Sequence, residues 1–401
     1  MNHSVFDWLA HGITGAGWGT LAIYLLIVTQ ITIFAVTLYL HRCQAHRGVD
    51  FHPALAHFFR FWVWLTTSMI TREWAAIHRK HHARCETEED PHSPQFLGIG
   101  NVLRRGVELY RAARRDRPSI EKYGKGCPDD WIERHLYTPH ATLGPVLMLA
   151  INALLFGFAG VAVWAIQMLW IPVWAAGVVN GLGHWWGYRN FETSDKSTNL
   201  SPWGVWIGGE ELHNNHHAFP SSAKFSLRRF EFDIGWAAIK VLEKLRLATV
   251  LRVAPTLDVR PNIAMPDGET LKALLSHRFQ AMTDYYRNVM LPALREEAVH
   301  AGENIKAMPR RFRKALADGG RWLDHDARER MHALVAHRPR LSTLVEFRSR
   351  LQALLEERSH DAAATLARLQ AWCHEAEASG IQSLQEFAAR LRSYALAPAR
   401  N

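Results

Sequence analysis

Nine histidines lie in four short clusters whose spacing is typical of metal ligands. They are His41 and His46; His78, His81 and His82; His184; and His213, His216 and His217. Neutral imidazole is the commonest protein ligand for iron, copper and zinc. In a His-x-x-His-His triplet, the i, i+3, i+4 spacing places three rings on one face of a helix. The sequence therefore predicts a site for two metal ions, assembled from four segments that are far apart in the chain.

Long uncharged segments lie beside these clusters. The mean hydropathy of -0.14 and the net charge of +9 would suit a soluble, basic protein. However, the chain contains no Lys, Arg, Asp or Glu between Asp7 and Arg42, and none between Arg134 and Arg189. A bilayer crossing needs about 20 apolar residues, and buried helices of soluble proteins rarely continue so long without a charge. We therefore expect an integral membrane protein.

The uncharged segments predict three crossings. The first segment has room for one helix over residues 18–40, which ends at His41. The second has room for a helical hairpin over residues 141–182, with its turn near Gly157 and Gly160. Because a hairpin returns the chain to its starting side, His184 emerges on the side from which the hairpin entered.

Residues 51–71 decide whether all nine histidines share one side of the membrane. If this segment crossed, the first cluster would be separated from the others. Its apolar residues recur at helical spacing, whereas His57, Arg60 and Thr67 occupy the other face, as in a helix that lies in the interface. We therefore expect one shared face. It is predicted to be cytoplasmic, because the chain has no Lys or Arg before Arg42 and is rich in both between Arg72 and Ala141.

The start of the chain and the cysteines exclude other classes of protein. Residues 1–17 lack the basic start and the cleavage site of a signal peptide, so we expect the first apolar segment to be kept. The four cysteines, Cys43, Cys85, Cys127 and Cys373, form no Cys-x-x-Cys pair and no dense framework. They predict neither a zinc ribbon nor a disulfide scaffold.

The four clusters keep a fixed order: His-x-x-x-x-His, His-x-x-His-His, Asn-x-x-x-His and His-x-x-His-His. Their flanking residues are His41-Arg42-x-x-x-His46-Arg47, Glu73-Trp74, Asp90-Pro91-His92, Gly187-Tyr188-Arg189, Glu211-Leu212-His213-Asn214-Asn215-His216-His217 and Phe219-Pro220. Over residues 18–235 the chain resembles the membrane fatty acid desaturases, specifically the stearoyl (delta-9) group. The four residues between His41 and His46 distinguish it from delta-12 desaturases and from alkane or sterol hydroxylases, whose first box is more often His-x-x-x-His.

This resemblance implies an enzyme with two iron ions and dioxygen as co-substrate, because no side chain can oxidise an unactivated C–H bond. The implied iron ligands are His41, His46, His78, His81, His82, His184, His213, His216 and His217, with Asn180 reaching one iron through water. On an ideal helix His41 and His46 are about 140 degrees apart, so we expect them to serve different irons. A ligand set of neutral histidines is also expected to leave the charge of the irons uncompensated.

Forming one double bond while reducing one dioxygen to two waters requires two electrons from outside. The chain has no haem-type His-Pro-Gly-Gly box, no iron–sulfur cysteines and no Gly-rich nucleotide loop. We therefore expect an external donor, ferredoxin-like or a cytochrome, with its reductase, and no nucleic acid partner. An acidic donor would be steered by the basic residues of the histidine-bearing face. These are Arg79, Lys80, Arg84, Arg104 and Arg105.

The expected reaction places a cis double bond near carbons nine and ten of a saturated acyl chain. In animal acyl-CoA members the two residues before the second box are commonly Arg-Asp, which help to hold CoA, whereas here they are Ala76 and Ile77. This difference favours a chain attached to a membrane lipid, with acyl-CoA as the alternative. A hydroxylase on the same scaffold shares the first hydrogen abstraction. A metal transporter would need more polar residues in the spans than this chain has.

The remaining histidines are expected to be ordinary interface or surface residues. His92 is a candidate for orienting metal ligands through hydrogen bonds, and Trp74 and Trp185 are candidates for the wall of an acyl tunnel. Beyond residue 260 the resemblance ends. There the chain has 21 Lys plus Arg and 17 Asp plus Glu, with helices such as residues 341–358, broken at Pro309, Pro339 and Ala378-Ser379-Gly380. A lid, a docking platform and a dimerisation module all stay open for this extension.

The predicted fold is an all-α integral membrane protein with about three transmembrane helices and an interfacial helix. Residues 1–260 would form the membrane desaturase domain, whose cytosolic helical cap carries the histidine-rich di-iron site. Residues 261–401 would form a soluble, charged helical extension. We expect the protein in a bacterial inner membrane, with the histidine cluster facing the cytoplasm.

Overall fold

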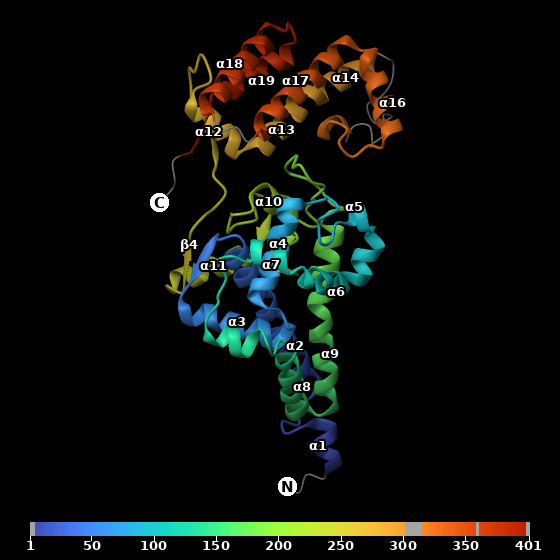
Figure 1. Cartoon of the computed structure of the whole chain (residues 1–401), viewed down its shortest axis with the longest axis vertical. Coiled ribbons are helices and arrows are strands. Elements are labelled where there is room, and N and C mark those ends of the chain that lie inside the picture. The colour runs from blue at the N-terminus through green and yellow to red at the C-terminus, as the bar shows by residue number, and fades with distance from the viewer. Residues whose placement is uncertain (1–4, 301–314, 358–360, 398–401) are drawn as a thin grey trace. The chain divides into compact units, whose positions relative to one another are not determined.

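The computed structural model describes residues 5–300, 315–357 and 361–397, and the chain divides into two compact units (Figure 1). Unit 1 consists of Met1–Arg189 and Asp195–Ala254, and it carries all nine clustered histidines. Unit 2 consists of Pro255–Asn401 together with the short segment Asn190–Ser194. This short segment therefore belongs to unit 2 although both of its neighbours in sequence belong to unit 1.

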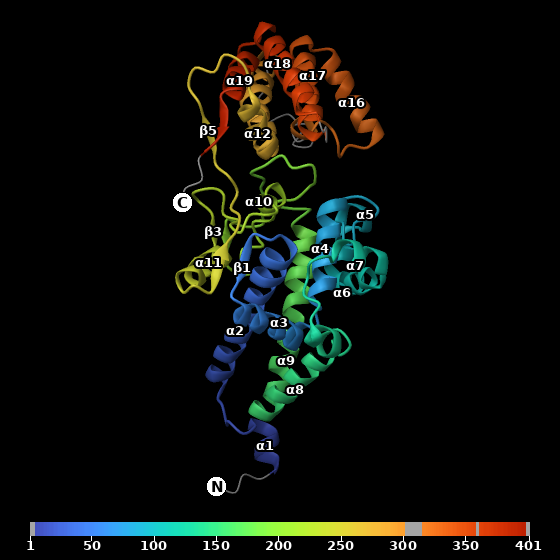
Figure 2. The ribbon, with the colours of Figure 1, turned by 60° about the vertical axis from the view of Figure 1, so that its left-hand side comes forward.

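Two long apolar helices and one shorter helix form the most apolar part of unit 1. Helix α2 (Trp18–Phe34) continues into the π-helical segment η1 (Ala35–Ala45), and α9 (Phe158–Ile171) continues into the π-helical segment η3 (Pro172–Leu182). These continuous helices of 28 and 25 residues are long and apolar enough to cross a bilayer. The shorter α8 (Leu143–Phe156) runs beside α9 (Figure 2), and α1 (Val5–His11) packs against both.

The helical hairpin was predicted correctly, but its first arm is shorter than a bilayer crossing needs. Gly157 joins α8 to α9 with a φ of +63°, and a Cβ there would overlap the carbonyl oxygen of Leu9, so the turn requires glycine. Helix α8 has 14 residues. At about 1.5 Å per residue it spans only about 21 Å of a hydrocarbon core of about 30 Å. Among the described residues, two helices rather than three have the length of a crossing.

The structure has one helix within residues 51–71, where the sequence predicts one, and this helix is shorter than the predicted segment. After strand β1 (Val49–Phe51), helix α3 (Pro53–Thr67) ends at Ser68, whose φ is +65°, and α4 (Thr71–Arg84) begins shortly after it. Helix α3 is amphipathic and, at 15 residues, too short to cross. Arg60 does not lie on a free polar face: its side chain is buried and pairs with Asp130 at 2.7 Å.

The cap of unit 1 consists of short helices and very short strands. The helical elements are α5 (Pro94–Leu97), α6 (Ile99–Arg115), α7 (Arg117–Tyr123), η2 (Glu133–Tyr137), α10 (His213–Ala218) and α11 (Ile234–Lys244). Strand β1 pairs antiparallel with β4 (Ala248–Val250), and β2 (Trp203–Gly204) pairs in parallel with β3 (Phe232–Asp233). The pairing of β1 with β4 joins the segment that follows the first histidine cluster to the last part of unit 1.

Arg42 fixes the π-helical segment η1 to the cap. Its guanidinium is fully buried and forms two hydrogen bonds of 2.9 Å with the carboxylate of Asp233. It also donates to the carbonyl oxygens of Gly208 and Ala223 at 2.9 and 2.8 Å. A buried charge that lost these partners would be strongly destabilising. The arginine of the first box is therefore a structural residue that sets the position of His41.

Unit 2 is a helical bundle with one antiparallel strand pair. Its described elements are β5 (Leu257–Val259), α12 (Gly268–Ser276), α13 (Arg278–Tyr285), η4 (Tyr286–Met290), α14 (Leu291–His300), α16 (His325–Ala336), α17 (Pro339–Glu356), α18 (Ala362–Ala378), α19 (Gln382–Arg392) and β6 (Tyr394–Leu396). Tyr285, Trp372 and Phe387 pack ring against ring in its core. Strands β5 and β6 pair, so the start and the end of the unit are joined.

The predicted helix over residues 341–358 is confirmed by α17, which begins at Pro339. The break before Ile381 is confirmed as well, since Gly380 with a φ of +72° separates α18 from α19. The break at Pro309 lies outside the described residues.

Candidate metal centre

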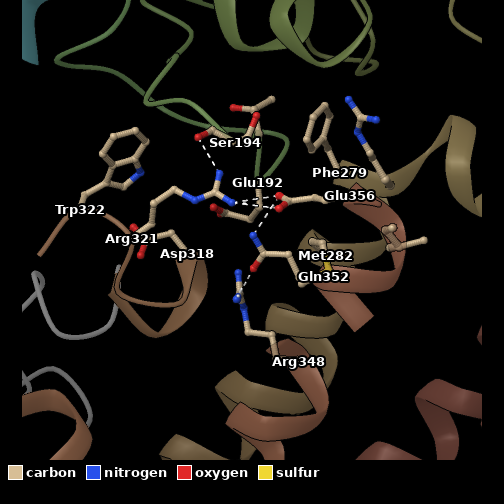
Figure 3. A pocket seen from close by; sticks show the side chains of 13 residues that line it. Glu192, Ser194, Phe279, Met282, Asp318, Arg321, Trp322, Arg348, Gln352 and Glu356 are labelled. Atoms are coloured by element: carbon tan, nitrogen blue, oxygen red, sulfur yellow. Dashed lines mark hydrogen bonds and ion pairs between the residues drawn. The ribbon is translucent and has the colours of Figure 1, made fainter. Parts of the chain in front are cut away.

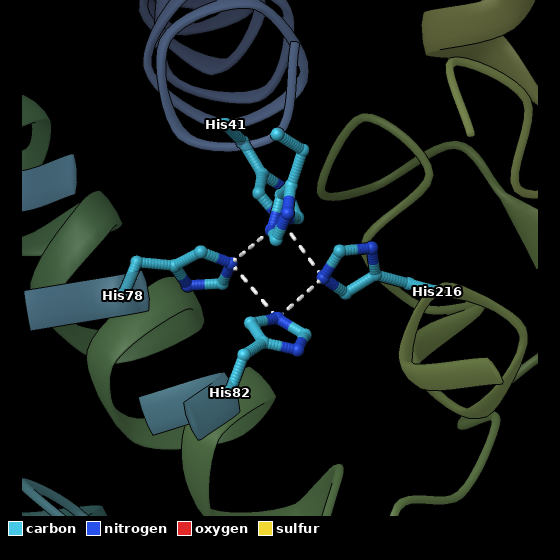
Figure 4. A group of neighbouring side chains, drawn as sticks. His41, His78, His82 and His216 are labelled. Atoms are coloured by element: carbon cyan, nitrogen blue, oxygen red, sulfur yellow. Dashed lines mark hydrogen bonds between the residues drawn. The ribbon is translucent and has the colours of Figure 1, made fainter. Parts of the chain in front are cut away.

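Five histidines from three elements converge in what we call the first group (Figure 4). Its members are His41, His46, His78, His82 and His216, and their ligand atoms all lie within 4.8 Å of one another. The Nε2 atoms of His46 and His78 are 2.8 Å apart, and those of His41 and His216 are 3.0 Å apart. Elements η1, α4 and α10 thus direct their imidazoles at one point.

The prediction that His41 and His46 would lie at different metals is wrong at the level of geometry, because both belong to the first group. Their ring centroids are 5.0 Å apart. The reason is that η1 is wound with i→i+5 hydrogen bonds, and the backbone N–H of His46 donates to the carbonyl of His41 at 3.1 Å. A π-turn brings residues five apart onto one face, whereas an α-helix would separate them by about 140 degrees.

We call His81, His184, His213 and His217 the second group. The ligand atoms of His81, His184 and His217 lie within 4.8 Å of one another and of the Cys85 thiol. The Nε2 atom of His213 is 2.9 Å from that of His184, which in turn is 3.2 Å from that of His81. Burial raises the pKa of the Cys85 thiol well above its usual value, so this sulfur is a neutral neighbour of the imidazoles.

Each His-x-x-His-His triplet contributes to both groups, in opposite ways. In α4 the i, i+4 pair of His78 and His82 belongs to the first group, and His81 belongs to the second. In α10 the i, i+4 pair belongs to the second group, and the middle histidine, His216, belongs to the first. Residues four apart share a helix face. The spacing therefore divides each triplet into a pair and a single histidine. Each group receives the pair of one triplet and the single histidine of the other.

Four buried carboxylates accept hydrogen bonds from Nδ1–H groups of these histidines. The pairs are His41 with Glu210 at 2.7 Å, His81 with Asp90 at 3.0 Å, His184 with Glu86 at 3.2 Å and His217 with Asp195 at 2.8 Å. Such partners fix the tautomer and turn the Nε2 lone pair towards a metal. The expectation of an uncompensated site is therefore wrong, since four carboxylates surround it, one at the first group and three at the second.

Burial keeps most of these imidazoles in the neutral form that binds metals. Burial, reinforced by the neighbouring His41, lowers the pKa of His46, His78 and His216 well below the usual value. At the second group, burial lowers the pKa of His217 to about 4, although Asp195 acts in the opposite direction. His81 differs: burial disfavours its charge, but Asp90 outweighs burial and raises its pKa.

The nitrogen contacts of the first group cannot all be hydrogen bonds. The Nε2 atom of His216 is 3.0 Å from that of His41 and 2.8 Å from that of His82, which is itself 3.1 Å from that of His78. A neutral imidazole nitrogen carries either one hydrogen or one lone pair, so it cannot form a well-aligned hydrogen bond with two other nitrogens at once. In the second group the buried Nε2 atom of His217 has no hydrogen-bond partner among the described residues. Cations facing these lone pairs would remove both conflicts, so the residues fit bound metal ions.

A cavity of about 170 Å³ reaches both groups. His41 and His78 of the first group, His213 of the second group and Asn180 line it. Its other walls are mainly apolar side chains of α4, α6, α9 and η3, among them Ile77, Val107, Met168, Ile171, Ala175 and Val179. The cavity thus connects apolar surroundings to the histidines, and Asn180 borders the same space.

Of Trp74 and Trp185, the two tryptophans predicted to line an acyl tunnel, only Trp74 borders this cavity. Its ring stacks on His78 with centroids 5.0 Å apart and also borders the cavity. Trp185 is 52% exposed and lies outside the lining. His92 lines the cavity too, and its backbone N–H donates to the Asp90 oxygen that His81 contacts. His92 therefore supports the orientation of Asp90.

Part of the basic face predicted to dock an electron donor is occupied by internal contacts. Arg79 donates to the carbonyl oxygens of Gln44, Ala45, Tyr123 and Lys125 at 2.6 to 2.9 Å. Lys80 pairs with Asp116 at 2.8 Å. Arg104 and Arg105 on α6 are exposed. The surface charge available to a partner is thus smaller than the sequence suggested.

Three carboxylates and one thiol of the centre were not predicted from the sequence. Glu86 and Glu210 lie close to a histidine box in the chain, and a search for acids near each box would have found them. Cys85 follows His81 by one helical turn, and its sulfur lies 3.8 Å from the Nε2 atom of that histidine. Asp195 offers no such signal, because it lies far from the nearest box on either side.

A sequence model described as fatty acid desaturase matches residues 16–233. The chain belongs to the fatty acid desaturase family. Similar proteins are icosanoyl-CoA 5-desaturase of Limnanthes douglasii, 30% identical over 57% of this chain and 64% of the relative, and delta-9 acyl-lipid desaturase 1 of Arabidopsis thaliana, 28% identical over 62% and 80%. The sn-1 stearoyl-lipid 9-desaturase of Anabaena variabilis is 28% identical over 59% and 85%.

The family model matches the histidine-bearing part of the chain. The chain spans less than two thirds of the Limnanthes relative. Within the extension, a sequence model described as transposase matches residues 278–397, which is too small a share of the chain to assign a family. Desaturases are oxidoreductases, and the arrangement of histidines agrees with that class of chemistry.

Proposed function

We propose that the protein is a di-iron, oxygen-dependent fatty acyl desaturase that introduces a cis double bond near carbons nine and ten of a saturated acyl chain. The observation that carries this proposal is the largely apolar cavity that ends at histidines of both groups. An alkyl chain has no polar group with which to bind, so it needs an apolar wall next to the oxidising centre. Membership of the desaturase family supports the same reaction.

The first group would hold one iron and the second group the other, with Asn180 near one of them through water. When bound, the two irons and dioxygen supply an oxidant strong enough for an unactivated C–H bond. The chain contributes orientation: Asp90, Glu86, Asp195 and Glu210 hold four imidazoles in the ligand tautomer. Apolar residues of α6, α9 and η3 exclude water from the alkyl chain.

A lipid-linked acyl chain fits the surroundings of the second box better than acyl-CoA does. Ala76 and Ile77, which replace the Arg-Asp pair of animal acyl-CoA members, are 1% and 6% exposed and pack against Ile120. They offer no charge to a CoA phosphate. Two relatives are named for acyl-lipid or stearoyl-lipid desaturation, and one for icosanoyl-CoA at carbon five. Acyl-CoA and a different bond position are therefore the alternatives that an experiment must separate.

Product analysis tests this function directly. We expect cells that express the protein with a suitable donor to accumulate cis delta-9 monounsaturated chains in phospholipid, resolved from free and CoA-linked pools by mass spectrometry with double-bond localisation. Cells that express His216→Ala provide the inactive control. Hydroxylated chains would identify a hydroxylase instead, and products confined to the CoA pool or desaturated at carbon five would overturn the substrate assignment.

We also propose that both groups face the cytoplasm of a bacterial inner membrane, where an external ferredoxin-like or cytochrome donor and its reductase can reach them. Asp50 and Glu88 are exposed and flank the segment that contains α3 and α4. Cysteines at these two positions should both be labelled from the cytoplasmic side in intact cells. A cysteine at Gly17, before α2, should be labelled only from the other side. Opposite labelling of residues 50 and 88 would separate the first cluster from the second and end the proposal.

A further inference from the structure

The segment Asn190–Ser194 is part of unit 2 but is joined in the chain to residues near the second histidine group. It belongs to unit 2, yet it is followed at once by Asp195 and Lys196, which belong to unit 1 and to the surroundings of the second histidine group. The Cα atoms of neighbouring residues are separated by a fixed distance, because the peptide bond between them is planar and rigid. The position of Ser194 therefore restricts where the carboxylate of Asp195 can lie.

Two hydrogen bonds join this segment to other parts of unit 2, and Figure 3 draws the one between Arg321 and Ser194. The backbone N–H of Glu192 donates to Oγ1 of Thr283 at 2.9 Å, and Thr283 lies buried on α13. Arg321 donates from Nη1 to the carbonyl oxygen of Ser194 at 2.8 Å. The two bonds act at different residues of the segment, so they fix its direction as well as its position.

Arg321 is itself fixed by side chains of α17. Its Nη2 donates to both carboxylate oxygens of Glu356, at 2.9 and 3.2 Å. Gln352 donates to the same carboxylate at 2.9 Å and accepts from Arg348 at 2.8 Å. Figure 3 shows this continuous polar row from Arg348 to Ser194. Connected partners of this kind position a group more accurately than a single flexible side chain does.

The residues that follow the held segment contact two histidines of the second group through carboxylates. Asp195 accepts from His217 at 2.8 Å. The backbone N–H of Lys196 donates to Oε1 of Glu86 at 2.8 Å, and the same oxygen is 3.2 Å from Nδ1 of His184. The first group has a different arrangement, because its carboxylate, Glu210, accepts from Thr37 within unit 1.

We propose that unit 2 positions the second metal group, with Thr283 and Arg321 as positioning residues that act through the segment Asn190–Ser194. The extension is thereby given a role: it sets how firmly the second group holds its iron, while the first group is independent of it. This proposal rests on the proposed function, since it requires iron in both groups.

The test compares iron retention in the purified full-length protein and four variants. Thr283→Val removes the acceptor of the Glu192 N–H with little change of shape, and Thr283→Ser restores a hydroxyl. Arg321→Ala removes the bond to Ser194. Arg350→Ala is the matched control, because Arg350 also forms an ion pair in unit 2, with Glu375 at 2.6 Å, away from the segment. Iron per chain, the rate of iron loss to a chelator and alkylation of Cys85 are measured.

We expect Thr283→Val and Arg321→Ala to release one of two irons at least about 10-fold faster than the unmodified protein, the size of effect typical when the partner of a metal ligand is lost. Alkylation of Cys85, which borders the second group, should rise, while that of Cys43, which lies within the first box, stays constant. Thr283→Ser and Arg350→Ala should retain both irons. Unchanged iron release in the first two variants, or equal loss of both irons, would overturn the proposal. An unmodified protein that binds no iron would instead refute the proposed function.

Discussion

The two histidine groups are built from the same motifs but differ in their surroundings. The first has five histidines and one carboxylate partner, Glu210, whereas the second has four histidines and three carboxylate partners. Two members of the first group line the cavity, and only His213 does so in the second. Negative charge nearby stabilises a bound cation. We infer that the second group holds its metal more firmly, while the first is more open to substrate.

The difference also shows how one short motif can serve two metals. The triplets in α4 and α10 are identical in spacing, yet each gives a pair to one group and a single histidine to the other. Two identical triplets in complementary orientation therefore build two unequal sites. The two sites differ because Glu86, Asp90 and Asp195, which lie in segments between the boxes, all contact the second group.

The largest effect is expected from replacing one of two histidines that are adjacent in the sequence but belong to different groups. His216→Ala should lose the iron of the first group and His217→Ala that of the second, so each variant should retain about one iron per chain. Both should lose desaturation by at least about 100-fold, more than the roughly 10–100-fold typical of losing a partner of a ligand. Metal analysis and product quantification measure this, with His332→Ala in unit 2 as a control histidine. If either variant lost both irons, the two groups would not be independent sites.

Much of this centre follows from the sequence, because ligands in short boxes reveal themselves by spacing. The nine histidines, the hairpin turn at Gly157 and the membership of Trp74 in the cavity wall needed no structure to be proposed. The grouping of His41 with His46 did need one. Helix periodicity of about 3.6 residues per turn predicts separation, and only the i→i+5 winding of η1 brings the two rings together.

The carboxylates were missed for a different physical reason. A buried acid is recognisable only from its partner, and Asp195 reaches His217 from a distant segment with no periodic pattern around it. Arg79 illustrates the converse error. In sequence it counts as surface charge, but in the structure it is used to hold four backbone carbonyls. In both cases the role of the charged side chain depends on whether it is buried, and the amino-acid composition does not show burial.

Blocking the cavity should separate substrate access from metal binding. Ala175 lines the cavity on η3, and Ala175→Trp would fill part of this cavity. We expect both irons to be retained and desaturation to fall at least about 10-fold, since an overpacked wall typically costs about 1–3 kcal/mol. Ala175→Ser, which changes the volume little, should keep most activity. Full activity in Ala175→Trp would show that the alkyl chain takes another path and that access does not distinguish the groups.

The smallest expected difference between two variants tests the charge difference itself. Glu210→Gln removes the carboxylate partner that the first group has, whereas Asp90→Asn leaves Glu86 and Asp195 at the second. Loss of a ligand's carboxylate partner typically weakens metal binding about 10–100-fold. We therefore expect Glu210→Gln to show a loss of this size in chelator competition, and Asp90→Asn a loss nearer the lower end.

The amide replacements keep the shape of the side chains, so packing is not the variable. The comparison is made within one protein, at one pH and ionic strength, because surface electrostatics depend on both. A larger loss in Asp90→Asn would mean that the carboxylates of the second group act as one hydrogen-bonded unit rather than as separate charges. The backbone N–H of Glu86, which donates to Asp90 at 2.8 Å, would then link two members of that unit, and the number of carboxylates would no longer explain why the two groups differ.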